Sequence, residues 1–161
     1  MIDQTTTPLE PVGLAGPADA TGPYKLLPAS FAQRRLWFLD QLDSGNSAYN
    51  LVAALRLRGT LDLAALHWSL NRVVERHEVL RTVFRADAAG EPRQCVAPGL
   101  TIPLPVTDLT REPEAGRAER ARALIETETE HVFDLARGPL IKTLAIRIAE
   151  QDHAPVSYTH L

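Results

Sequence analysis

Apolar residues recur along the chain with two different periods, and segments of the two kinds follow one another. Spacings of three and four residues predict helices over residues 30–42, 61–77 and 112–130. Alternation and short β-branched runs predict strands over 50–58, 80–85, 93–96, 102–106 and 140–148, the last being the clearest. The D-A-A-G run from Asp87 to Gly90 predicts a hairpin turn between the 80–85 and 93–96 strands. Because helices and strands are interleaved, the pattern predicts a mixed class, α/β or α+β.

The first predicted helix has a clear start but an imperfect apolar face. Ser30 followed by Gln33 is a capping box, in which each side chain satisfies a free backbone N–H. Arg35 falls inside the apolar arc and Trp37 falls on the polar side, so both break the amphipathic pattern. Such exceptions indicate function or a partner surface. The alternative is that the Arg35 side chain extends to the rim of the apolar face and that Trp37 is covered by another element of the chain. The predicted apolar face comprises Phe31, Ala32, Leu36, Phe38, Leu39 and Leu42.

The apolar pattern predicts different environments for three of the histidines. His77 falls on the apolar stripe of the second helix, which predicts a hydrogen-bonded core histidine rather than an acid or base. His67 and His131 have no clustered partner and are predicted to be solvated. The third helix carries a narrow apolar stripe and many charges, which is typical of a surface helix. Pro103 and Pro105 are expected to bend the 102–106 strand.

The amino-terminal segment differs in composition from the rest. Residues 1–25 are rich in proline, glycine and threonine and are predicted to form a flexible linker, with order beginning near Tyr24. The folded part is predicted to occupy residues 26–155.

Composition excludes several classes of function. Seventeen Lys and Arg residues against twenty Asp and Glu give a net charge of −3, so no nucleic-acid partner is expected. The single cysteine, Cys95, cannot form a disulfide within the chain; it is expected in a strand, and a reducing, cytoplasmic location fits best. No apolar run approaches the roughly 20 residues that a membrane span needs, and no signal peptide is expected.

Neither a phosphate loop nor a metal site is predicted. None of the glycines has the spacing of a phosphate-binding loop. The run from His77 to Arg81 begins like a zinc-protease helix, but Arg81 occupies the position of the second histidine ligand.

Three longer motifs carry a family resemblance. The chain reads S-F-A-Q-R-R-L-W-F-L-D-Q-L from Ser30, R-H-E-V-L-R-T-V-F from Arg76 and F-D-L-A-R-G-P-L from Phe133. In this order and spacing they resemble signatures of nonribosomal peptide synthetase condensation domains. The matching positions are Ser30, Ala32, Gln33, Leu36, Trp37 and Phe38 in the first motif and Arg76, His77, Glu78, Leu80, Arg81, Thr82 and Phe84 in the second.

The resemblance implies a fold and a reaction. The fold would be related to that of chloramphenicol acetyltransferase, and this chain would be its truncated amino-terminal lobe, an α/β (α+β) two-layer sandwich. The reaction would join an acyl or peptidyl thioester on one carrier domain to the amine of an aminoacyl thioester on another. The phosphopantetheine arms would belong to those carriers, with an adenylation domain in the same assembly line, and no cofactor would bind this chain directly.

The family's catalytic centre is a further signature, H-H-x-x-x-D-G, whose second histidine is central. Its aspartate is structural and pairs with an arginine of the second motif; Arg76 is slightly favoured here over Arg81. Arg35 is expected to brace the first helix against neighbouring backbone or carboxylates.

This chain departs from the family at that signature. Ala154–Thr159 fills the six places before it, His160 takes the first histidine position and Leu161 the second, with no Asp-Gly following. No catalytic residue is therefore assigned, and the chain by itself is expected to be inactive. Residues 156–161 resemble translated sequencing-adapter text, which predicts an artefactual tail that diverges from the true chain near Pro155.

Two alternatives on the same fold stay open. One is a non-catalytic recruitment domain that lacks the histidine signature, and the other is a related acyltransferase or epimerase. The unaltered second motif favours peptide condensation, with an L-configured donor.

Overall fold

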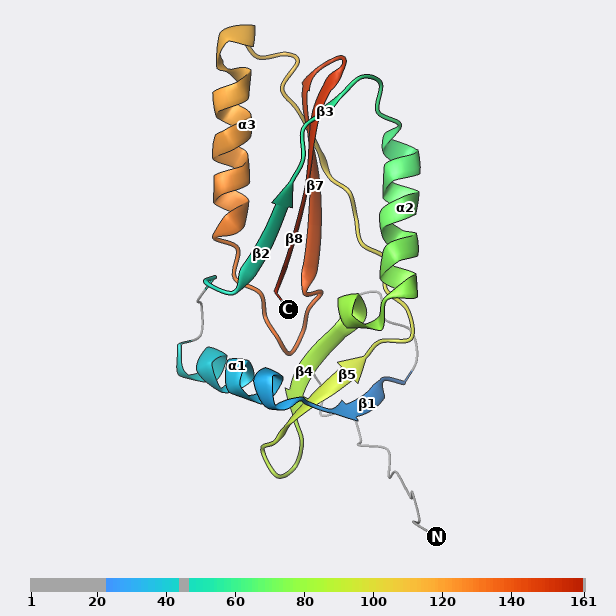
Figure 1. Ribbon diagram of the computed structural model, residues 1–161, viewed down its shortest axis with the longest axis vertical. Coiled ribbons are helices and arrows are strands. Elements are labelled where there is room, and N and C mark those ends of the chain that lie inside the picture. The colour runs from blue at the N-terminus through green and yellow to red at the C-terminus, as the bar shows by residue number, and fades with distance from the viewer. Residues whose placement is uncertain (1–22, 44–46, 161) are drawn as a thin grey trace.

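A computed structural model of the chain describes residues 23–43 and 47–160 (Figure 1). Helices and strands are interleaved, as the hydrophobic pattern predicted. In chain order the elements are β1 (Lys25–Pro28), α1 (Phe31–Leu42), β2 (Asn50–Ala54), β3 (Leu57–Arg58), α2 (Leu63–Arg76), the 3-10 turn η1 (Glu78–Arg81), β4 (Thr82–Ala86), β5 (Pro92–Val96), β6 (Val106–Asp108), α3 (Glu114–Thr129), β7 (Ile141–Ala149) and β8 (Asp152–His160).

The larger sheet is built around β7 and β8. Its strand order is β2-β8-β7-β6, and β3 pairs with the start of β8. The β2–β8 and β7–β8 pairs are antiparallel, whereas β6 runs parallel to β7. This arrangement joins segments far apart in the sequence, since Asn50 lies opposite His160.

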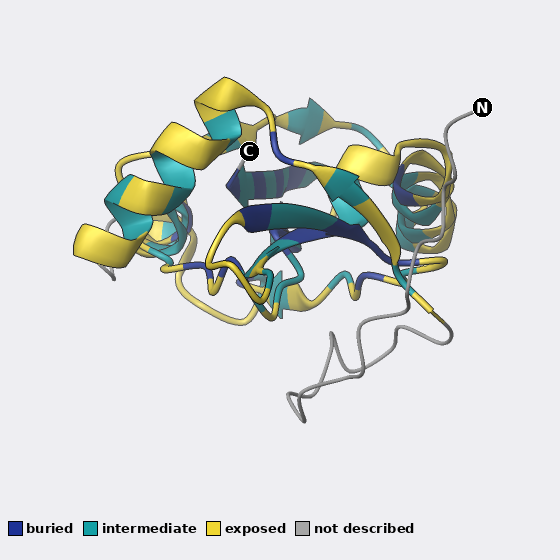
Figure 2. Ribbon diagram, turned by 90° about the horizontal axis from the view of Figure 1, so that it is seen from below, coloured by how far each residue is buried: buried dark blue, intermediate teal, exposed yellow. Residues whose placement is uncertain are grey.

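The two faces of β7 are covered by different helices, which lie on either side of the sheet in Figure 1. Leu144 and Ile146 belong to the main core together with Ala121 of α3. Ile141, which points to the other face, packs with Val74 of α2 and with Ile102. Figure 2 shows the buried residues concentrated in the central strands, while the helices turn exposed faces outward.

The smaller sheet has the order β1-β5-β4 and contains the predicted hairpin. The Asp87 carboxylate accepts hydrogen bonds from the backbone N–H groups of Ala89 and Glu91 and from Nε of Arg93. These bonds lower the pKa of Asp87 below its usual range, with the bond from Arg93 contributing most. Gly90 supplies the positive φ, 82°, that the turn requires.

Helix α1 begins as predicted but buries a different side. The Ser30–Gln33 capping box is present. The predicted buried face is wrong, because Phe31, Phe38 and Leu42 are 88%, 57% and 68% exposed, while Trp37 packs against the main core. Helical periodicity shows which side chains share a face, but not which face the rest of the chain covers.

Several boundaries differ from the prediction. The 50–58 strand is divided into β2 and β3, and residues 80–81 belong to η1. Within 102–106 only Val106 is in a strand, because Pro103 and Pro105 lack the N–H that a ladder needs. Strands β1 and β8 were not predicted, and β8 runs into the residues assigned to a tail. The predicted linker lies outside the described residues except for positions 23–25.

Candidate functional site

Arg81 is the best-enclosed charged residue of the second motif. Its side chain is 12% exposed, and it ends η1 where α2 is joined to β4. Its Nε donates to the carbonyl of Ala97 at 2.9 Å, and Nη1 donates to the carbonyl of Glu75 at 3.3 Å. The carboxylate of Glu78 lies 3.8 Å from Nη2, too far for a good hydrogen bond. Within residues 23–43 and 47–160 the guanidinium is thus held by backbone carbonyls, and its one carboxylate neighbour is loosely placed.

Arg76 and His77 lie on the surface instead. Arg76 ends α2 and is exposed, and His77 is the exposed residue that caps it. The predicted core position of His77 is wrong, because α2 ends one residue earlier. The N–H of His77 donates to Val73, and its carbonyl accepts from Leu80 to open the 3-10 turn.

The remaining residues of the second motif hold the lobe together. Thr82 is buried, and its hydroxyl donates to the carbonyl of Glu78 at 2.7 Å. The Glu78 carboxylate pairs with Lys25 of β1 at 3.1 Å. Leu80 packs against the smaller core cluster, which contains Val74, Ile102 and Ile141, and Phe84 packs against the main core. These positions have structural contacts rather than catalytic geometry.

The first motif stabilises the start of α1 with its capping box and packs Trp37 against the main core. Gln33 donates to Gln94 of β5 at 3.4 Å in addition to closing the capping box. Leu36 is half-buried, whereas Ala32 and Arg35 are exposed. Among the described residues no hydrogen bond or ion pair is found for the Arg35 side chain, so the bracing contacts expected of it are not seen in this part of the chain.

The third motif anchors the small sheet to the large one. Phe133 and Leu135 are buried in the main core, and the carbonyl of Leu135 accepts from Phe84 of β4 at 2.7 Å. Gly138 has φ 63°, and a Cβ there would lie 2.7 Å from Cγ1 of Val83. Glycine is therefore required at this position for both conformation and space.

A small cavity lies where β8 ends. His160 is 7% exposed, and its ring meets Tyr49 and Phe133 edge to face, with centroids 6.2 and 6.4 Å away. Burial lowers the pKa of His160, and the negative charge of Asp40 partly opposes this. The cavity has a volume of about 140 Å³. Its lining consists of Leu39, Asp40, Leu42, Asp43, Tyr49 and His160. Leu161, at the position of the family's central histidine, lies outside the described residues.

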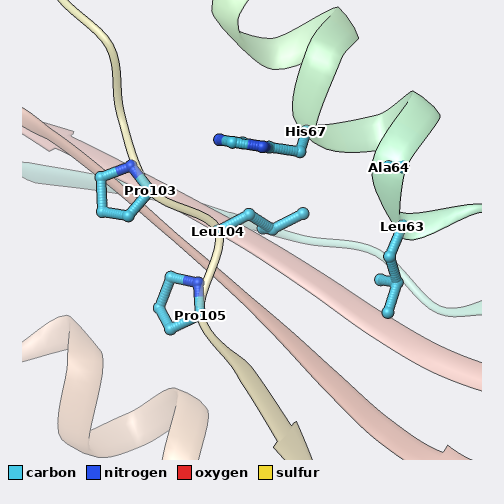
Figure 3. A pocket seen from close by; sticks show the side chains of 6 residues that line it. All are labelled: Leu63, Ala64, His67, Pro103, Leu104 and Pro105. Carbon is cyan, nitrogen blue, oxygen red and sulfur yellow. The ribbon is translucent and has the colours of Figure 1, made fainter.

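A second hollow, shown in Figure 3, is apolar. It lies between the first turns of α2 and the Pro103–Pro105 segment. His67 borders it, but Nε2 of this ring is 2.8 Å from the carbonyl of Ile102, to which Asn71 also donates. The prediction that His67 is solvated is wrong, because its ring helps to hold this segment against α2.

A polar cluster that the sequence did not indicate lies between α3 and the large sheet. The Tyr158 hydroxyl donates to the Glu128 carboxylate, and Nζ of Lys142 lies 5.7 Å from the Tyr158 ring centre. Burial and the carboxylate raise the pKa of Tyr158. His131 is half-buried here rather than solvated, and burial and Lys142 lower its pKa. Only the three-dimensional pairing of β7, β8 and α3 unites these residues.

Two absences hold for residues 23–43 and 47–160. No three His, Cys, Asp or Glu side chains there are grouped so that they could hold a metal ion. No helix in the same ranges is both long and apolar enough to cross a membrane.

The sequence matches the family model of the condensation domain over residues 24–160. Phosphinothricin tripeptide synthetase PhsC of Streptomyces viridochromogenes is 46% identical over 134 residues, which are 83% of this chain and 12% of that protein. The isonitrile lipopeptide synthase of Mycobacterium tuberculosis is 42% identical over an alignment that covers 99% of this chain and 6% of that protein.

Solved structures show the same fold. The starter condensation domain of rhizomide synthetase RzmA superposes with a TM-score of 0.76 at 24% identity, covering 84% of this chain and 34% of that one. The first condensation domain of the calcium-dependent antibiotic synthetase gives 0.74 at 22% identity, covering 84% and 34%. The chain therefore spans about a third of these solved domains.

Proposed function

This chain belongs to the condensation-domain family of nonribosomal peptide synthetases, and we propose that it forms the amino-terminal part of a domain that makes amide bonds. The donor is an acyl or peptidyl thioester on one carrier domain. The acceptor is the free amine of an aminoacyl thioester on another carrier domain. The amine attacks the donor carbonyl, the carbon–sulfur bond breaks, and the donor carrier leaves as a thiol.

The match to the family over residues 24–160 is the observation that carries this proposal. Such a reaction depends mainly on holding two tethered substrates together. It also needs a group that accepts the proton of the amine and a donor for the oxyanion. In this family the first role belongs to the histidine signature, and the three motifs present here build the lobe that would support it.

Arg81, rather than Arg76, is the proposed partner of the signature's aspartate. The structure supports this choice because the Arg81 side chain is 12% exposed and its carboxylate neighbour is 3.8 Å away, whereas Arg76 is exposed. A largely enclosed guanidinium whose nearest carboxylate is 3.8 Å away would be stabilised by a closer anionic partner. The slight preference for Arg76 from the sequence thus has no support from burial.

The chain by itself is proposed to be inactive. It has no second histidine and no Asp-Gly after His160. We also propose the division into a linker at 1–25, a condensation-domain segment at 26–155 and an artefactual tail at 156–161. The family carries mostly apolar residues in the places before its histidine pair, and such residues would fill the same strand as Val156 and Tyr158 do here.

The proposed partners follow from the reaction. They are the peptidyl and aminoacyl carrier domains and the adenylation domain of one assembly line in the cytoplasm. The phosphopantetheine arms belong to the carriers, and no cofactor is proposed to bind this chain directly.

The test uses two loaded carrier proteins and mass spectrometry of the acceptor carrier. A long sequencing read through codon 153 of the source genome would supply the natural continuation, and that longer domain is expected to transfer the donor to the acceptor amine. The 161-residue chain is expected to give no product. Product from the short chain would overturn the proposed inactivity, and none from the longer domain with several matched substrate pairs would overturn the proposed reaction.

A further inference from the structure

The net charge of the chain, −3, lies entirely in its first 22 residues. Asp3, Glu10 and Asp19 are there and no lysine or arginine is, so the remaining seventeen acidic and seventeen basic residues cancel. Residues 8–19, called the acidic segment below, read P-L-E-P-V-G-L-A-G-P-A-D. Two of the three carboxylates therefore alternate with the larger apolar side chains Leu9, Val12 and Leu14, a composition that suits a basic surface with apolar parts.

The outward side of α2 is a surface of this kind. Trp68, Arg72 and Arg76 follow one another at intervals of four residues and so share one side of the helix. Trp68 is 67% exposed, and the Arg72 guanidinium lies 5.8 Å from the centre of its ring. Arg72 also pairs with Glu75, whereas Arg76 is exposed and has no ion pair within residues 23–43 and 47–160. Exposed tryptophan and arginine side chains are typical of the centre of a protein interface.

The apolar hollow of Figure 3 adjoins these residues. Ala64 lines the hollow and lies one helical turn before Trp68. The opposite wall is the Pro103–Pro105 segment, which is held to α2 through His67 and Asn71. The volume of the hollow, about 520 Å³, is many times the roughly 30 Å³ that a water molecule occupies. The hollow therefore has room for apolar side chains from a bound segment.

The chain enters the described fold beside this side of α2. Lys25 of β1 pairs at 3.1 Å with Glu78, which opens η1 just after α2 ends (Figure 1). Trp68 lies eight residues before the end of α2, which is about 12 Å along the helix axis. The acidic segment ends four residues before Pro23, and an extended residue spans about 3.3 Å. The acidic segment is therefore long enough to pass Arg76 and reach Trp68.

A segment of the same chain is favoured over other occupants of this surface. Its connection to β1 gives it an effective concentration of about 1 mM, so a contact with a Kd of about 1 mM between separate molecules would be half formed within one. Its three prolines restrict the backbone and lower the entropy that docking costs. A second copy bound by two-fold symmetry would instead bring the same arginines together, which like charges disfavour.

We infer that the acidic segment docks along the outward side of α2, with its apolar side chains against Trp68 and the hollow and its carboxylates beside Arg72 and Arg76. The linker proposed for residues 1–25 is then held along the lobe over part of its length. Any domain that precedes the linker would be attached on this side of the lobe. Docking requires neither the proposed reaction nor residues 156–161.

The test places a nitroxide label on the 161-residue chain through Thr7→Cys, next to the acidic segment. Cys95 is buried and should not react. Each of the two tryptophans gives one indole N–H signal in a nitrogen-15 NMR spectrum. Docking should lower the Trp68 signal at least threefold relative to the chain with reduced label. The signal of Trp37, which packs against the main core, is the internal reference and should fall much less.

Exchange of charges gives the specific result. Arg72→Glu combined with Arg76→Glu should raise the Trp68 signal at least twofold. Glu10→Lys combined with Asp19→Lys should do the same while changing no residue that the structure describes. Both pairs together should bring the loss of signal back, because opposite charges face each other again.

Arg120→Glu combined with Arg122→Glu on α3 is the matched control, because Arg122 also pairs with a glutamate three residues away in its helix. This variant should leave the loss at Trp68 unchanged. No loss at Trp68, or equal loss at both tryptophans, would overturn the inference. Loss in a nitrogen-15 chain mixed with a spin-labelled chain lacking nitrogen-15 would overturn it too, since a second copy would then be the occupant. Should the α2 variant fail to fold, an undiminished loss in the Glu10→Lys, Asp19→Lys chain would refute the docking by itself.

Discussion

The β7–β8 pair and helix α1 are both rich in apolar residues, but only the first is covered within this chain. Ile146 is fully buried between α3 and the neighbouring strands, whereas Phe31, Phe38 and Leu42 face outward. The described part of the chain thus completes one core and leaves a second apolar surface open. Stability should depend on the first region, and association should depend on the second.

Truncating the completed core should have the largest effect. Ile146→Ala removes a side chain with no exposed surface and leaves a cavity, which costs about 2–5 kcal/mol of the free energy of unfolding. Urea denaturation followed by circular dichroism measures the change. Phe38→Ala on α1 is the matched control, with an expected change below about 0.5 kcal/mol. Similar losses for both variants would break the comparison.

The second-largest effect is expected from the two arginines of the second motif, which should differ in how much they contribute to the free energy of unfolding. Arg81→Ala leaves the carbonyl of the buried Ala97 without its side-chain donor and should cost about 1–3 kcal/mol, because an unsatisfied buried group is expensive. The second bond that is lost, to the carbonyl of the exposed Glu75, should add little. Arg76→Ala should change little, since Arg76 is exposed. Lysine at position 81 should rescue only part of the loss, because it lacks the planar fork. In a longer domain with the proposed aspartate the loss should rise to roughly 3–5 kcal/mol. Equal melting temperatures for the two alanine variants would show that burial misidentifies the structural arginine.

Adding a single methyl group at Gly138 tests the third motif, which connects the small sheet to the large one. Gly138→Ala forces a Cβ against Val83 in a left-handed backbone conformation and should cost about 1–3 kcal/mol. Gly116→Ala, in α3 with open space around its Cβ, should instead stabilise the helix by up to about 1 kcal/mol. Thermal unfolding of the two variants gives the comparison directly.

The open surface of α1 should govern association rather than stability. Replacing Phe31 and Phe38 by serine should reduce the self-association expected of this chain, with little change in melting temperature. Sedimentation velocity over a range of concentrations measures this. A monomeric unchanged chain at high concentration would contradict the importance of this surface.

The smallest predicted effect is a pH dependence in the hairpin. Hydrogen bonds hold the pKa of Asp87 below its usual range, so the charged carboxylate stabilises the fold. This contribution is complete above the unfolded pKa of about 3.9 and is lost as the pH falls through the lower folded pKa. Asp87→Asn should flatten the acid limb of the stability profile, and an unchanged limb would contradict this.

Local patterns predicted most of the elements, and long-range pairing explains what they missed. The capping box at Ser30, the hairpin at Asp87 and the β7 strand follow from neighbouring residues. Strand β8 and the side of α1 that Trp37 occupies depend on partners elsewhere in the chain. The same holds for the site, since the motifs identified Arg81 as a candidate but did not predict that its side chain is largely buried. Nothing in the sequence indicated that Asp40 faces His160 across the fold.

The strand order of the large sheet has a consequence for synthesis on the ribosome. Within the described residues, β2 pairs only with β8, which starts about 100 residues after β2 ends. At roughly 5–20 residues per second, β2 waits on the order of 5–20 s for its neighbour to be made. During that interval the nascent chain exposes an unpaired strand edge, to which another chain could add. Translation speed over this stretch is therefore expected to influence how much of the protein reaches its native sheet.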